Sequence, residues 1–262
     1  MSFIRVETET EIAKVTLDHP TGNRINFAMR EELLQAFQRI ADSKARVLVI
    51  RGKGTDFSLG GDVRDWVGKS AAELTPRIGV FAKAIEVLEQ LKIPTIAAVQ
   101  GACMGGGFEL ALGCDLIVAA RSARFAFPEA RVGIVTLQGG VFQMAERIGR
   151  SKAIEMAFLS EPVAAEQMAV WNVVNHVVED AALEAEAEAL AQRLAAGPPG
   201  AYAVTKALLS LWKQGGRTAA SAALYDLSMP LFDTQDVQTA MKSAAVAIDA
   251  GHPLPKANFT GA

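Results

Sequence analysis

Two glutamates twenty positions apart, Glu109 and Glu129, are the side chains of this sequence most able to do chemistry. Glu109 lies in an apolar run directly after three consecutive glycines, and Glu129 follows Phe127-Pro128. Carboxylates are seldom buried without a partner or a chemical role. Adding water across a double bond needs one group to activate the water and another to deliver a proton, and two carboxyls in one apolar cleft have pKa values suited to this. The alternative is a buried salt bridge for each glutamate.

Two glycine-rich segments, 56–62 and 101–107, follow predicted strands at 47–50 and 95–99. In a parallel sheet both segments then lie at the carboxyl ends of strands, where ligands bind. Glycine lets the backbone approach a ligand and present its N–H groups, and two such groups aimed at one carbonyl oxygen form an oxyanion hole. The second segment also opens a helix, whose positive dipole end adds to the effect. The alternative is close helix–strand packing.

The first two thirds of the chain alternate between strand and helix patterns, which predicts an α/β fold with a mostly parallel sheet. Alternating or β-branched runs predict strands at 12–17, 47–50, 95–99 and 116–119. Apolar residues at helical spacing predict helices over 29–40 and 78–91.

Beyond about residue 180 the pattern is helical throughout. A helix is predicted over 181–196, the break Gly197-Pro198-Pro199-Gly200 follows, and further helices are expected at 201–214, 217–231 and 235–250. Helices without strands cannot enlarge the sheet, so they must pack on it or on another subunit. We therefore expect a core over 1–196 and an appended helical region over 197–262.

Composition excludes several classes of function. With 26 Lys and Arg against 29 Asp and Glu, the chain has no basic surplus for nucleic acid or an anionic membrane. Cys103 and Cys114 lie in apolar segments without CxxC spacing and are expected to be reduced core thiols. We find no signal peptide and no membrane span, so a cytoplasmic protein is expected. The three histidines, His19, His176 and His252, are too scattered for a metal site.

Three segments together resemble the crotonase (enoyl-CoA hydratase/isomerase) superfamily. They are Phe57-Ser58-Leu59-Gly60-Gly61-Asp62, the stretch from Ile93 through Gly106-Gly107-Phe108-Glu109 to Asp115, and Phe127-Pro128-Glu129 followed by Gly133. They occur in the family's order, and the similarity extends from about residue 3 to about residue 240.

The resemblance implies a spiral of repeated ββα units with C-terminal helices that form a homotrimer or homohexamer. It implies an acyl-CoA thioester substrate, whose oxygen is held by the backbone N–H groups of Gly61 and Gly106. Hydratases of the family carry both carboxylates, at the positions of Glu109 and Glu129. The favoured interpretation is thus an enoyl-CoA hydratase in fatty, aromatic or alicyclic acid breakdown, with no metal or redox cofactor. An enoyl-CoA isomerase or another crotonase reaction is the alternative, and a binding module is a third.

The resemblance also implies substrate contacts. Arg24 and Ile25 match the stretch near the adenine and phosphates of coenzyme A, and Trp66 matches a position in the acyl pocket. Leu137 stands where relatives often have glycine, so both bulky side chains are expected to favour short or flat acyl groups. Leu59, Asp62 and Val63 complete the predicted substrate-binding set. The C-terminus lacks the family's basic Phe-x-x-Lys-Arg pattern, which leaves Arg24 to meet the phosphate charge.

Overall fold

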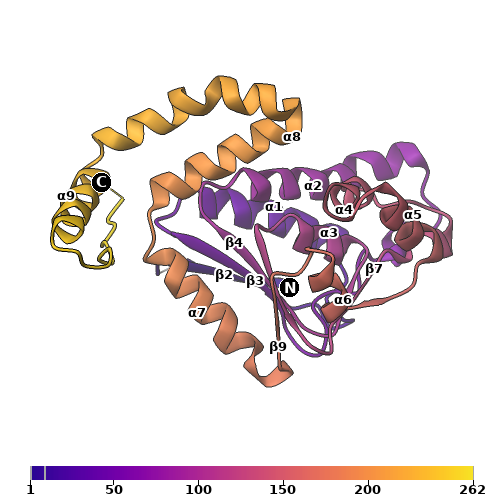
Figure 1. Ribbon diagram of the computed structural model, residues 1–262. Coiled ribbons are helices and arrows are strands. Elements are labelled where there is room, and N and C mark those ends of the chain that lie inside the picture. The colour runs from indigo at the N-terminus through magenta and orange to yellow at the C-terminus, as the bar shows by residue number, and fades with distance from the viewer. Residues whose placement is uncertain (1, 9, 262) are drawn as a thin grey trace. The chain divides into compact units, whose positions relative to one another are not determined.

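The computed structural model describes residues 2–8 and 10–261 (Figure 1). The chain divides into two compact units after residue 191. This division falls within helix α7, Leu183–Ala195, shortly before the break predicted at 197.

A six-stranded sheet forms the centre of the first unit. Its order is β1-β2-β3-β4-β6-β9, and every neighbouring pair is parallel except β1 with β2. The strands are β1 Ile4–Glu7, β2 Ile12–Leu17, β3 Val47–Gly52, β4 Thr95–Val99, β6 Leu116–Ala120 and β9 His176–Val178. All five residues of β4 are buried, as expected for a central parallel strand covered on both faces. The mostly parallel α/β sheet predicted from the sequence is confirmed.

A second, three-stranded sheet explains the repeating pattern of the fold. It contains β5 Ala102–Met104, β7 Arg124–Ala126 and β8 Val163–Ala164, and Ser58 adds a single bridge to Cys103 of β5. Twice the chain therefore runs through a strand of the large sheet, a short strand of the small sheet and then a helix. This is the predicted ββα repeat.

The small sheet corrects one expectation about the glycine segments. Residues 101–107 do not form a simple loop at the end of β4, because Gly101 turns the chain with φ +55° and β5 follows. The segments that carry the two glutamates thus begin where the second strand of each repeat ends. Glu109 lies after β5, and Glu129 lies after β7.

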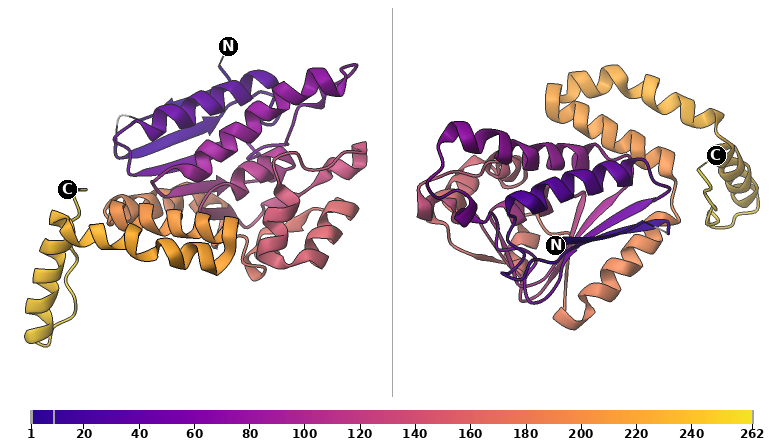
Figure 2. Two further views of the ribbon diagram at one scale, coloured as in Figure 1. Left: turned by 90° about the horizontal axis from the view of Figure 1, so that it is seen from above. Right: turned by 180° about the vertical axis from the view of Figure 1, so that it is seen from behind.

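Helices pack against the large sheet and against one another. Helices α1, Phe27–Ala41, and α2, Ala71–Gln90, lie side by side (Figures 1 and 2). The remaining helices of this unit are α3 Gly106–Leu112, α4 Gly140–Ile148, α5 Arg150–Leu159 and α6 Ala165–Val170, with one-turn helices η1 Val63–Asp65, η2 Pro128–Val132 and η3 Asp180–Ala182. Every residue of α3 is buried, so Glu109 is carried on a helix inside the core.

The second unit is helical, as predicted. It contains α8 Pro199–Ser228, the short helix η4 Met229–Asp233 and α9 Gln235–Asp249. Gly215 and Gly216 have non-helical backbone angles, which places a kink where the sequence predicted a break. No residue of α8 or α9 is buried, although both carry large apolar side chains. Among the described residues, no helix is long and apolar enough to cross a membrane.

Candidate active site

Glu109 is a buried carboxylate held by backbone donors. Its side chain is on α3 and the residue is only 1% exposed. The N–H groups of Gln138 and Gly140 donate to Oε1 over 2.8 and 2.9 Å. Burial raises the pKa of Glu109, while these backbone hydrogen bonds and the positive charge of Arg30 act to lower it. The salt bridge considered as an alternative is absent, since no described cation lies within ion-pair distance of Glu109.

Glu129 lies on η2 and has a different environment. Its Oε2 is buried and has no hydrogen-bond partner in the described chain. Burial, with a further contribution from the negative charge of Glu109, raises its pKa to about 7. The two carboxyls therefore interact electrostatically. Glu109 accepts hydrogen bonds from the N–H groups of two other residues, whereas Glu129 accepts one from its own backbone N–H and its Oε2 has none.

Gly105 makes room for the Glu129 carboxyl. A Cβ at this position would lie 2.6 Å from Glu129 Oε1, closer than the two atoms can approach. The backbone of Gly105 also has φ +50°, a left-handed conformation that favours glycine. The first glycine of the triplet is thus required by the second carboxylate as well as by the turn into α3.

The N–H groups predicted to form an oxyanion hole are close together. Gly106 begins α3, and the nitrogen of Gly61 lies 3.7 Å from the position that a Cβ on Gly106 would occupy. Neither N–H donates a hydrogen bond to another group in the described residues. The helix dipole of α3 favours negative charge at the same point. Two backbone donors without partners in the described chain thus lie near one another at the start of α3, as the predicted oxyanion hole requires.

Side-chain hydrogen bonds hold the loop that carries Gly61. Asn23 is buried, and its Nδ2 donates to the carbonyl oxygens of Lys53 and Asp56. The hydroxyl of Ser58 donates to the Asn23 carbonyl and accepts from the N–H of Gly60. The loop before Gly61 is therefore fixed on two sides, by these buried contacts to Asn23 and by the bridge between Ser58 and Cys103 of β5.

One small cavity, with a volume of about 30 Å³, brings the predicted catalytic groups together. A water molecule needs about 10–15 Å³ on this measure, so the space suits about two waters. The Trp66 ring occupies much of the surrounding space, since two of its carbons lie 2.8 Å from where a Gly61 Cβ would be. Seven residues of the predicted set line the cavity, namely Ile25, Gly61, Trp66, Gly106, Glu109, Glu129 and Leu137.

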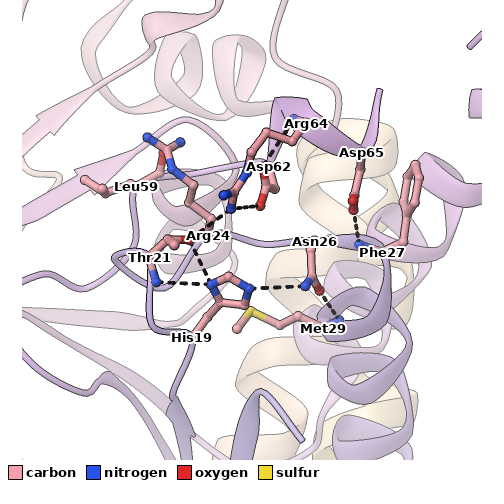
Figure 3. A network of polar contacts seen from close by, with 10 residues as sticks. All are labelled: His19, Thr21, Arg24, Asn26, Phe27, Met29, Leu59, Asp62, Arg64 and Asp65. Carbon is pink, nitrogen blue, oxygen red and sulfur yellow. Dashed lines mark hydrogen bonds and ion pairs between the residues drawn. The ribbon is translucent and has the colours of Figure 1, made fainter. Parts of the chain in front are cut away.

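The other four predicted residues, Arg24, Leu59, Asp62 and Val63, do not line this cavity, and Figure 3 shows the contacts of the first three. Arg24 is half-buried, and its Nη1 donates to the carbonyl of Leu59 over 3.4 Å. The carboxylate of Asp62 pairs with Arg64 and accepts from its backbone N–H, which caps η1. Val63 is 42% exposed. Asp62 is thus already engaged within the loop, and the positive charge of Arg24 also acts on its carboxylate.

Arg30 is a cavity residue that the sequence reasoning missed. It is on α1, is 3% exposed, and lines the same cavity as both glutamates. Its spacing in the sequence could have indicated that it is buried, because Arg30 precedes the buried Leu33 and Phe37 by three and seven positions and so lies on the same helical face. Burial lowers its pKa to about 10, with the charges of Asp65 and Glu109 opposing that change.

The remaining titratable candidates have local roles. His19 contacts the Thr21 hydroxyl and the Asn26 amide through its two ring nitrogens (Figure 3). Cys103 and Cys114 are buried and take no part in a disulfide. Within the described part of the chain, no three His, Cys, Asp or Glu side chains gather as a metal site would require.

Comparison with known proteins identifies the family. The family model described as enoyl-CoA hydratase/isomerase matches residues 7–245. The chain belongs to this family, the crotonases. It is 39% identical over 216 residues to mevalonyl-coenzyme A hydratase of Beauveria bassiana, covering 78% of this chain and 77% of that protein. It is also 39% identical over 197 residues to carnitinyl-CoA dehydratase of Escherichia coli, covering 74% and 75% respectively.

Solved structures agree with this assignment. An enoyl-CoA hydratase/carnitine racemase from Magnetospirillum magneticum superposes with a TM-score of 0.87 at 31% identity, covering 100% of this chain and 97% of that one. The crotonase fold predicted from the three motifs is therefore confirmed. This protein is a crotonase-family enzyme, and members of the family act on acyl-CoA thioesters.

Proposed function

We propose that this crotonase is a 2-enoyl-CoA hydratase, which adds water across the 2,3 double bond of an acyl-CoA in fatty, aromatic or alicyclic acid breakdown. The main observation in support of this proposal is that Glu109, Glu129, Gly61 and Gly106 all line one cavity. The relatives reported above are named for hydration and dehydration of CoA thioesters, which agrees with it.

The different environments of the two carboxyls support distinct roles. Backbone donors to Glu109 stabilise its anion, which suits a base that orients and deprotonates the attacking water. Glu129 accepts a hydrogen bond from its own backbone N–H but has none to Oε2, and its pKa is about 7, which suits an acid that protonates C2. The N–H groups of Gly61 and Gly106 stabilise the enolate oxygen that develops as water adds at C3. The proposed chemistry requires no metal or redox cofactor.

The small cavity bears on substrate binding. A volume of about 30 Å³ does not accommodate a four-carbon acyl group, so the Trp66 ring or the exposed segment around Leu137 must shift when the thioester enters. Leu137 is 41% exposed and follows the one-turn helix η2, so it has room to move. We propose that these two side chains form the acyl wall and that Arg24 meets the CoA phosphates.

We also propose that the protein assembles as a homotrimer or homohexamer in the cytoplasm. The helical second unit supports the assembly, because in the single chain it leaves large apolar side chains uncovered. On α8 these are Leu209, Trp212, Leu224 and Tyr225.

A panel of 2-enoyl-CoA and 3-enoyl-CoA thioesters tests the activity. A hydratase removes the conjugated-enone absorbance of the 2-enoyl substrates, and the product is the 3-hydroxyacyl-CoA. An isomerase instead makes this absorbance appear from the 3-enoyl substrates. Turnover of the 3-enoyl panel without hydration of any 2-enoyl thioester would refute the proposal.

A further inference from the structure

Arg30 places an unpaired guanidinium beside the reacting centre. Its Nη2 lies 3.7 Å from the position that a Cβ on Gly61 would occupy, next to the proposed oxyanion hole. Nε and Nη1 are buried and have no hydrogen-bond partner among the described residues. No described carboxylate lies within ion-pair distance, although Asp65 and Glu109 act on its charge from further away. A buried cation is costly without such a partner.

Two aromatic rings hold this guanidinium in place without satisfying its donors. The Arg30 carbon Cζ lies 5.2 Å from the centre of the Phe27 ring and 5.5 Å from that of Trp66. Ring stacking orients the planar fork, but it accepts none of the N–H bonds. The same cavity holds a further unsatisfied donor, because Trp66 Nε1 is also buried without a partner. Arg30 and Trp66, which both line this cavity, thus carry buried donors that lack acceptors.

We propose that Arg30 determines specificity for acyl groups that carry an oxygen acceptor, a hydroxyl or a carboxylate, at the end of a five-carbon chain. This inference rests on the proposed function, because it assumes that the thioester carbonyl lies at Gly61 and Gly106. A planar guanidinium offers several donors in fixed directions, so it can pair with either kind of oxygen. A plain alkyl chain in the same place leaves the buried charge unpaired, and the free-energy cost of an unpaired buried donor exceeds the net gain from an ordinary hydrogen bond.

Equilibrium binding of three saturated five-carbon thioesters tests the proposal without requiring turnover. They are valeryl-CoA, 5-hydroxyvaleryl-CoA and glutaryl-CoA, which end in a methyl, a hydroxyl and a carboxylate. We expect at least one oxygenated thioester to bind roughly 10- to 100-fold more tightly than valeryl-CoA, as hydrogen bonds to a charged group usually do. The tighter of the two identifies the kind of oxygen that Arg30 recognises.

Arg30→Met should remove this preference while leaving valeryl-CoA binding within about threefold. Arg77→Met is the matched control, because Arg77 also stacks on Phe27, at 5.0 Å, but is exposed and lies outside the cavity. The control should keep the preference. Arg30→Lys retains the positive charge without the planar guanidinium, so this variant should retain only part of the preference for oxygenated thioesters. Circular dichroism of each variant checks folding.

Two results would overturn the inference: valeryl-CoA binding as tightly as both oxygenated thioesters, or Arg30→Met weakening all three equally. The first needs only the unmodified protein, so it stands even if the methionine variant does not fold. Hydration of crotonyl-CoA without any preference for oxygenated acyl groups would defeat this inference and leave the proposed function intact. A preference that depends on Arg30, without hydration of any enoyl-CoA, would defeat the proposed function instead.

Discussion

Replacing Glu129 by Gln should lower turnover sharply and should also remove a loss of stability that the unmodified protein suffers as pH rises. Burial raises the pKa of Glu129 from 4.5 to about 7. A carboxyl with a raised pKa in the folded state favours folding below its unfolded pKa, and that contribution is lost as pH rises towards the folded pKa. At about 1.36 kcal/mol per pKa unit, the loss above pH 7 is about 3 kcal/mol, of which about 2.5 kcal/mol falls between pH 5 and pH 8.

Urea denaturation at pH 5 and pH 8, at one protein concentration, measures this difference. The free energy of unfolding of the unmodified protein should fall by about 2 to 3 kcal/mol more over this interval than that of Glu129→Gln. The amide cannot ionise, so pH-independent effects of the substitution cancel in the comparison. If the two proteins show the same pH dependence, Glu129 does not have a raised pKa, and its assignment as the acid loses its physical basis.

Three further predictions concern the site and the assembly. Gly105→Ala should displace the Glu129 carboxyl and lower kcat at least about tenfold, whereas Gly68→Ala, with similar φ but nothing within 4 Å of its Cβ, should keep full activity. In the unmodified protein, kcat/KM should be higher for crotonyl-CoA than for dodecenoyl-CoA. Trp66→Ala should reduce the ratio of these two kcat/KM values by about 10-fold or more. A preference for dodecenoyl-CoA in the unmodified protein would contradict the assignment of Trp66 and Leu137 to the acyl wall. Light scattering should give the mass of a trimer or hexamer, and a truncation at residue 197 that stays soluble, monodisperse and active would argue against assembly through the helical unit.

Four of the six strands of the large sheet were predictable from apolar or alternating runs, whereas β1 and β9 were not predicted. Residues 47–50 and 95–99 read directly as buried strands, and both lie in the centre of the sheet. The small sheet was not predictable, because β5, β7 and β8 contain only two or three residues each and show no periodicity. Helices α4 and α5 were also missed, since they are short and meet at Gly149.

The candidate site was visible where glycine and carboxylate occur together. Glu109 follows its glycines within one segment, so burial and a nearby turn could both be inferred. The sequence could not reveal that Asp62 pairs with Arg64 or that Arg30 lines the cavity. Each of these facts depends on where a long side chain lies in the folded structure. The spacing of Arg30 places it on the buried face of α1, but spacing alone does not indicate which groups it contacts there.

The most direct test of the hydratase mechanism is the rate of crotonyl-CoA hydration in Glu109→Gln, Glu129→Gln and the double variant, followed by loss of the enone absorbance. Each single change should lower kcat by about 10²- to 10⁴-fold with little change in thioester binding. The double variant should lose far less than the product of the two single losses, because the carboxyls act as a unit. A near-normal rate in either single variant would contradict the mechanism, since addition of water requires both carboxyls.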